Sequence, residues 1–180
     1  MQEVKIIIED GGVMPRKATD GAACFDLYAP CDFELKHGRQ VMPLKIRIQL
    51  PVNKTAIIEA RSGFASKGIE VVVQDWSGQH KKHIDADVLR GIIDCDYTGI
   101  VGAIIKVNEE LTARTFIPKG TRIAQMMIID VPPVSFVQVD KLDETERGDG
   151  GYGHTGASDN AKQGEKPKKK AGRPRKTKEE

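Results

Sequence analysis

Cysteine is scarce in this sequence, and long apolar runs are absent. The three cysteines, Cys24, Cys31 and Cys95, are odd in number and lack the spacing of a metal site. This argues against a disulfide framework or a zinc centre and is typical of a reducing compartment. The longest apolar runs, such as IAQMMII at 123–129, are far too short to cross a membrane. We expect a soluble intracellular protein, cytoplasmic or, in a eukaryote, nuclear. Whether its gene is cellular, viral or from a phage stays open.

Helix signals are also scarce, and short β-like segments dominate. Several alternate apolar with polar residues, as in Leu44, Ile46, Ile48 and Leu50, and glycine and proline separate them. Many short strands with turns at this spacing predict an all-β sandwich or barrel. Two single helical turns are expected, in ASKGIE and in HIDADVLR, where Asp85 is a plausible N-cap.

Charge and composition divide the chain into parts. From residue 161 onward there are nine Lys/Arg and three Glu, whereas residues 1–160 hold 19 Lys/Arg and 23 Asp/Glu. Apolar periodicity ends near residue 146. We therefore expect a folded domain at 1–146, a flexible glycine-rich arm at 147–158 and a basic disordered tail at 159–180.

Two short segments carry residues suited to phosphate chemistry. Arg61, Ser62 and Gly63 offer a guanidinium, a hydroxyl and an unhindered backbone N–H, and a helical turn starting there would add to an anion site. A plain polar turn is the alternative. In GIIDCDYTG, Asp94 and Asp96 are either solvated turn residues or include a base that activates water.

Two further segments offer ligand contacts. Arg122 and Gln125 lie three apart on a predicted strand and should point to opposite faces. Gln125 is the better ligand candidate, because a neutral amide on an apolar strand needs a partner, whereas Arg122 would equally serve as a structural ion-pair residue. In the arm, Arg147 can bind phosphate and Tyr152 can stack on a base, although a simple linker is the alternative.

Five segments occur in a characteristic order: AACFDLYAP, ARSGFASKGI, GIIDCDYTG, GTRIAQMMI and RGDGGYGHTG. Together they resemble the homotrimeric dUTPase (dUTP diphosphatase) family. The resemblance implies a distorted antiparallel β-barrel of jelly-roll type, a homotrimer whose sites draw on all three subunits, and Mg²⁺-assisted hydrolysis of dUTP to dUMP and pyrophosphate. Such an enzyme limits uracil incorporation into DNA.

The resemblance also implies a role for each matching residue. Asp94 would be the general base for attack at the α-phosphorus, and Asp26 would orient waters of the Mg²⁺. Tyr97 would stack beneath the deoxyribose and exclude a 2′-hydroxyl. The backbone of Gly91, Ile92 and Ile93 would bind uracil, and Tyr152 would cap the uracil ring. Phosphate would be bound by Arg61, Ser62, Gly63 and Arg147, and by Gln125 from a neighbouring subunit.

The chain departs from the family pattern at several positions. Cys24 stands where glycine is usual, Tyr152 replaces the commoner phenylalanine, and a substrate-contacting asparagine falls near Val88 and is missing. The asparagine after the third segment is offset to Asn108. The stretch at about 71–90 is longer than usual, and this insertion would decorate the trimer, cover the pocket or contact a partner.

Two rival functions share this fold. A dCTP deaminase needs a glutamate on the strand after the third segment, but that position falls at Ile104, between Ala103 and Ile105. A regulatory nucleotide sensor, associated with DNA, would keep the site without needing turnover. In addition, the tail at 161–180 resembles an AT-hook through KPKKKAGRPRK, and it would bind nucleic acid weakly or act in solubility or localisation.

Overall fold

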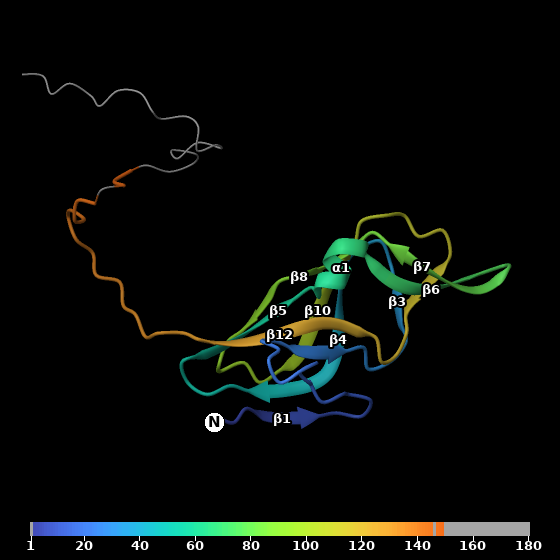
Figure 1. Cartoon of the computed structure of the whole chain (residues 1–180), viewed down its shortest axis with the longest axis horizontal. Coiled ribbons are helices and arrows are strands. Elements are labelled where there is room, and N and C mark those ends of the chain that lie inside the picture. The colour runs from blue at the N-terminus through green and yellow to red at the C-terminus, as the bar shows by residue number, and fades with distance from the viewer. Residues whose placement is uncertain (1, 146, 150–180) are drawn as a thin grey trace, which may run out of the picture. The chain divides into compact units, whose positions relative to one another are not determined.

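The computed structural model describes residues 2–145 and 147–149, and this part of the chain is almost entirely β-structure (Figure 1). In the described residues there is one short helix, α1 (Ser62–Lys67), and no helix long and apolar enough to cross a membrane. The strands are β1 (Lys5–Ile8), β2 (Phe25–Tyr28), β3 (Phe33–Leu35), β4 (Gly38–Gln49), β5 (Lys54–Glu59), β6 (Ile69–Asp75), β7 (Gly78–Ile84), β8 (Ala86–Leu89), β9 (Gly91–Ile93), β10 (Ile100–Val107), β11 (Arg114–Ile117) and β12 (Arg122–Asp130).

These strands pair antiparallel in three four-stranded sheets. Their orders are β1-β4-β10-β8, β3-β11-β6-β7 and β2-β12-β5-β9. Neighbours in a sheet are mostly far apart in sequence, which is typical of jelly-roll topologies rather than of simple meanders. The prediction of an all-β, antiparallel, jelly-roll-like architecture is confirmed.

The core follows from period-two alternation. On β10, and on β4 from Met42 onward, every second side chain is buried, including Leu44, Ile46, Val101 and Ile105. Because successive residues of a strand point to opposite faces, this alternation places one face of each strand in the interior.

The predicted insertion forms regular strands rather than an irregular surface loop. β6 and β7 make a hairpin whose register runs from the Ile69–Ile84 pair to the Asp75–Gly78 pair, with its tip beyond the neighbouring strands (Figure 1). Trp76, in the turn, is 98% exposed. Asp75 accepts hydrogen bonds from the backbone N–H of Ser77 (2.8 Å) and from its hydroxyl (2.6 Å), which fixes the turn.

One of the two predicted helical turns is present and the other is wrong. ASKGIE overlaps the end of α1, but HIDADVLR contains the end of β7 and all of β8. Ile84, Ala86 and Val88 are buried while Asp85 and Asp87 are exposed. This is the strand period, and it outweighs the capping preference of Asp85.

The chain divides into two compact units, residues 1–135 and 136–180. The described residues of the second unit contain no strand or helix. Several of its large apolar side chains are exposed, namely Phe136, Val137, Val139 and Leu142. The predicted basic tail lies outside the described residues, and so does most of the predicted arm.

Candidate active site

The first candidate site is a pocket at the turn through which the chain passes from β9 to β10, two strands of different sheets, and we call it the hairpin pocket after the hairpin that the resemblance places here. Its volume of about 290 Å³ is at the small end of ligand pockets, which span roughly 300–1,000 Å³. The pocket therefore suits one ring system and its sugar better than a whole nucleoside triphosphate. Its lining residues are Val41, Ile58, Gly91, Ile92, Ile93, Asp94, Tyr97, Ile100, Val101, Gly102 and Ile104.

Tyr97 is held at one end of this pocket by contacts within the turn. Its hydroxyl donates a hydrogen bond to the carbonyl of Ile100 (3.0 Å). A Cβ atom added to Gly99 would lie 2.4 Å from the Tyr97 hydroxyl oxygen, so only glycine leaves room for the ring. The glycine of the YTG sequence thus lets a half-exposed aromatic face line the pocket.

The structure distinguishes the two neighbouring acids. Asp94 lines the pocket, whereas Asp96 does not, and both are exposed. Among the described residues, no side chain pairs with the Asp94 carboxylate. A carboxylate without an ion-pair partner retains its lone pairs for a water or a substrate group, as a general base requires.

The second candidate site is a polar pocket where β2, β12 and the start of α1 meet. It gathers four predicted residues: Asp26, Arg61, Ser62 and Gln125. Arg61 is the N-cap residue of α1 and Ser62 is its first residue, so the expected helical turn does begin here. Cys24 lines the same pocket, together with Ala18, Ala22 and Ala23.

Asp26 is the ionic centre of this polar pocket. It is only 8% exposed. Its Oδ1 accepts a hydrogen bond from Arg61 Nε (2.9 Å), and its Oδ2 accepts one from Arg122 (3.3 Å). Because Arg61 uses Nε for this contact, its two terminal nitrogens remain for an anion in the pocket.

Arg122 and Gln125 approach the same residue, contrary to the prediction that they point apart. Gln125 lies opposite Asp26 in the strand register, and its amide donates to the carbonyl of Ala60 (3.0 Å). The register between β12 and β2 shifts between Arg122 and Ala124. This β-bulge inserts one residue and changes the alternation. The alternative of a structural ion pair for Arg122 is confirmed.

The two pockets lie at opposite edges of one sheet. Asp26 is on β2 and Asp94 follows β9, and β12 and β5 lie between these strands. Three strand spacings correspond to about 14 Å. A single copy of the chain therefore does not bring Asp94 beside Asp26.

The described residues contain no group of three or more His, Cys, Asp or Glu side chains that could hold a metal ion. A direct metal bond to Asp26 would compete with two arginine contacts. A carboxylate oxygen has more than one acceptor position, so each can still accept from a water. Asp26 thus fits a contact to a metal-bound water, the role that the resemblance implies.

Sequence reasoning missed part of the hairpin pocket. Val41 on β4 lies opposite Ile104 on β10, and both line the pocket. A Cβ atom on Gly102 would lie 2.7 Å from Val41 Cγ1, so the glycine allows Val41 to approach β10. An isolated glycine within a β-branched strand was the available signal.

The other predicted positions are less informative. Val88 is buried on β8 and does not line the hairpin pocket. Asn108 donates hydrogen bonds to Asp85 and Asp87, so it braces the turn before β8. Gly63 lies within α1. Arg147 belongs to the second unit, and Tyr152 lies outside the described residues.

Comparison with known proteins identifies relatives over most of the chain. The family model described as dUTPase matches residues 10–84 and 76–156, two segments that overlap within the β6–β7 hairpin. A deoxyuridine 5′-triphosphate nucleotidohydrolase of Corynebacterium efficiens is 33% identical, over 89% of this chain and 82% of the relative. One of Fusobacterium nucleatum is 36% identical, over 86% of this chain and 97% of the relative.

Solved structures show the same fold. A mutant dUTPase of Staphylococcus bacteriophage 80alpha with dUpNHpp has a TM-score of 0.71 and 20% identity, and the match covers 87% of this chain and 99% of that one. Since the family model matches far more than half of the residues and the relatives exceed 30% identity, the chain belongs to the dUTPase family.

Proposed function

We propose that this protein hydrolyses dUTP to dUMP and pyrophosphate, with Asp94 as the general base that activates water for attack at the α-phosphorus. The observation that carries the proposal is the Asp94 carboxylate, which lines the hairpin pocket and has no ion-pair partner among the described residues. Asp94 directly follows β9, the strand of Gly91, Ile92 and Ile93 that the resemblance assigns to uracil. The biological effect would be a lower dUTP concentration and less uracil in DNA.

In this proposal the hairpin pocket selects the nucleoside. The backbone of Gly91, Ile92 and Ile93 would hydrogen-bond the uracil edge, and the apolar lining would reject a thymine methyl by size. Tyr97 would pack against the deoxyribose and leave no space for a 2′-hydroxyl. A site whose backbone groups pair with one base edge penalises another base strongly, because its polar groups are then left unpaired.

The polar pocket would hold the triphosphate. Arg61, Ser62, Gly63 and Gln125 supply donors for phosphate oxygens, and Asp26 would hold a water of the accompanying Mg²⁺. That ion supplies positive charge to the phosphates. From the arm, Arg147 would bind the terminal phosphate and Tyr152 would cover the uracil ring.

A homotrimer would unite these parts. The two pockets lie at opposite edges of one sheet, so a complete site needs a second copy of the chain. The arm of a third copy would complete the site, as the family resemblance implies.

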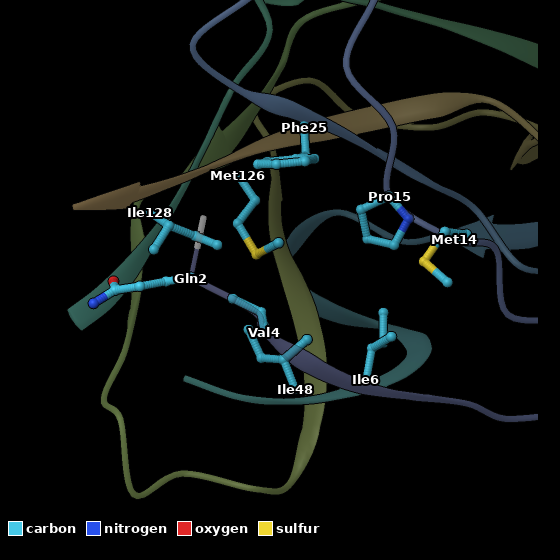
Figure 2. A pocket seen from close by; sticks show the side chains of 9 residues that line it. All are labelled: Gln2, Val4, Ile6, Met14, Pro15, Phe25, Ile48, Met126 and Ile128. Atoms are coloured by element: carbon cyan, nitrogen blue, oxygen red, sulfur yellow. The ribbon is translucent and has the colours of Figure 1, made fainter. Parts of the chain in front are cut away.

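Two apolar surfaces are consistent with burial between copies. One is the groove in Figure 2. The other is the segment after β12 within the first unit, where Val131 and Val134 are exposed. Apolar grooves and clusters of exposed apolar side chains occur at interaction sites. The groove is lined by Gln2, Val4, Ile6, Met14, Pro15, Phe25, Ile48, Met126 and Ile128.

The direct test is pyrophosphate release from each dNTP and from UTP, with and without Mg²⁺. We expect Mg²⁺-dependent release from dUTP, with kcat/KM at least about 100-fold lower for dCTP, dTTP and UTP. Ammonia release from dCTP would instead identify a deaminase. Tight dUTP binding without pyrophosphate release would identify a nucleotide sensor.

Subunit sharing has a separate test. Asp94→Asn and Asp26→Asn variants, each with a lowered kcat/KM for dUTP, are dissociated, mixed, reassembled and assayed at dUTP concentrations below KM. Hybrid trimers should regain activity, because some sites combine an intact hairpin pocket from one chain with an intact polar pocket from another. No gain on mixing, or a monomer by size-exclusion chromatography with full activity, would contradict the trimer.

The basic tail at 161–180 is proposed to bind nucleic acid weakly through its lysines and arginines. Binding of duplex DNA should fall steeply with salt, because phosphate contacts release counterions. Deleting residues 161–180 should abolish this binding and leave dUTP hydrolysis unchanged. Absence of DNA binding by the full chain at low salt would exclude the proposal.

A further inference from the structure

The strand that leads into Asp94 is short and lies at a sheet edge. β9 has three residues and pairs only with β5, through Ala56–Ile93, Ile57–Ile92 and Ile58–Gly91. After Ile93 the chain turns away, and the turn closes with a hydrogen bond from the N–H of Tyr97 to the carbonyl of Asp94 (3.2 Å). The direction of the Asp94 side chain therefore depends on how firmly the end of β9 is fixed.

A buried side chain fixes that end. The Thr55 hydroxyl donates a hydrogen bond to the carbonyl of Ile93 (2.8 Å), and Thr55 is 8% exposed. If the β5–β9 register continued by one residue, Thr55 would lie opposite Asp94. Thr55 itself is on an interior strand, where it pairs with Ile129 of β12. The hydrogen bond thus joins the peptide group preceding Asp94 to a rigid part of the sheet.

The other end of β9 has a weaker restraint. Arg90 forms an ion pair with Glu59 beside Gly91, and the side chains are 68% and 34% exposed. Exposed ion pairs typically contribute less than about 1 kcal/mol and are screened by salt. The Thr55 bond is buried, and leaving a buried carbonyl without its partner is costly. It is the stronger of these two side-chain contacts at the ends of β9.

From this geometry we infer that Thr55 is a positioning residue for Asp94, acting through the carbonyl of Ile93. The inference rests on the proposed function, because it takes Asp94 as the general base. Thr55 touches no reacting atom. Its hydroxyl sets the point at which β9 ends, and so the distance from the Asp94 carboxylate to the attacking water.

The test begins with Thr55→Val, which removes the hydroxyl and keeps the shape. A misplacement of 1 Å in an active site costs roughly 100-fold in rate, and a smaller shift is expected here. We expect kcat for dUTP to fall about 10-fold with KM changed less than about 3-fold. Thr55→Ser keeps the donor and should restore kcat to within about 2-fold of the unmodified protein.

Thr115→Val is a matched control. Thr115 is 2% exposed and donates to the carbonyl of Ala113 (3.0 Å), but it lies on β11 in a different sheet from β9. Both valine variants should lose a similar amount of thermal stability, whereas only Thr55→Val should lose kcat. Equal kcat for the two valine variants would overturn the inference.

The double variant, Thr55→Val with Asp94→Asn, distinguishes a positioning role of Thr55 from a general loss of active-site structure. If Thr55 acts through the carboxylate, Thr55→Val should not lower further the residual rate of Asp94→Asn. Additive losses in the double variant would contradict the inference. Full turnover by Asp94→Asn would refute the proposed function instead. Loss of turnover by Asp94→Asn with unchanged kcat in Thr55→Val would refute only the role of Thr55.

Should Thr55→Val fail to fold, Thr55→Ser and Thr55→Ala provide the same comparison. Both lack the methyl group, and only serine retains the hydroxyl. A kcat ratio of about 10 between them supports the positioning role, and a ratio near 1 overturns it.

Discussion

The two pockets of this protein treat their carboxylates in opposite ways. In the polar pocket, Asp26 is buried and both of its oxygens accept from arginines. In the hairpin pocket, Asp94 is exposed among apolar side chains and glycine backbone. The first arrangement orients cations that can hold phosphate. The second leaves a carboxylate available to accept a proton.

The comparison teaches that the environment of an acid indicates its role better than its position in a motif. A carboxylate that accepts hydrogen bonds from two guanidinium groups holds those groups in a fixed orientation. A carboxylate without such partners keeps its acceptor positions for a water or a substrate group. Each of the following substitutions tests one side of this contrast.

The largest effect is expected from Asp94→Asn. General-base catalysis typically contributes 10²–10⁴-fold, so kcat should fall about 1,000-fold while the Kd for a non-hydrolysable dUTP analogue stays nearly unchanged. Asp96→Asn is the matched control, since Asp96 is exposed and does not line the pocket. It should retain kcat within about 3-fold. An equal loss in both variants would remove the distinction between the two acids.

A smaller effect is expected from Asp26→Asn. The amide cannot neutralise Arg61 and Arg122, so the arginines should lose their orientation, raising KM for dUTP about 10-fold and lowering the melting temperature. Glu34→Gln is the control, because Glu34 pairs with Arg114 on an exposed surface of another sheet. Steady-state kinetics and thermal unfolding should show nearly the same KM and melting temperature for Glu34→Gln as for the unmodified protein. A normal KM in Asp26→Asn would refute its role in the polar pocket.

The smallest effect on turnover is expected from Glu109→Gln, because Glu109 lines neither pocket. The backbone N–H of Asp85 and then the Lys82 ammonium hold the pKa of Glu109 below its usual 4.5. Its stabilising contribution is therefore complete above about pH 4.5 and is lost as the pH falls through the lower folded-state pKa. Thermal unfolding between pH 6 and pH 3 should show a flatter acid dependence in Glu109→Gln, with kcat at neutral pH unchanged. Glu110→Gln, at an exposed neighbouring position, should follow the unmodified protein.

Much of this structure is predictable from local patterns. Period-two alternation identified the long strands, such as the one containing Leu44, Ile46 and Ile48. The resemblance assigned Asp94 and Tyr97 to the water and the sugar, and Arg61, Ser62 and Gln125 to phosphate. The division of these residues between two pockets of one chain came from the structure alone. Side-chain chemistry was informative wherever neighbours in sequence stay neighbours in space.

The remainder depends on contacts between distant segments. No sequence pattern predicted the bulge after Arg122, because a bulge depends on the pairing partner as well as on the strand itself. Val41 was missed for the same reason, since it reaches the hairpin pocket from β4. Capping preference misled the interpretation near Asp85, where burial of alternate residues decides the conformation.

The exposed turn of the β6–β7 hairpin has an optical consequence. Trp76 is the only tryptophan of the chain, and it is already in water in the folded protein. Its fluorescence should therefore change little when the sheets unfold. A blue-shifted emission would report that another molecule has covered the turn, so the protein carries an intrinsic probe of contact rather than of folding.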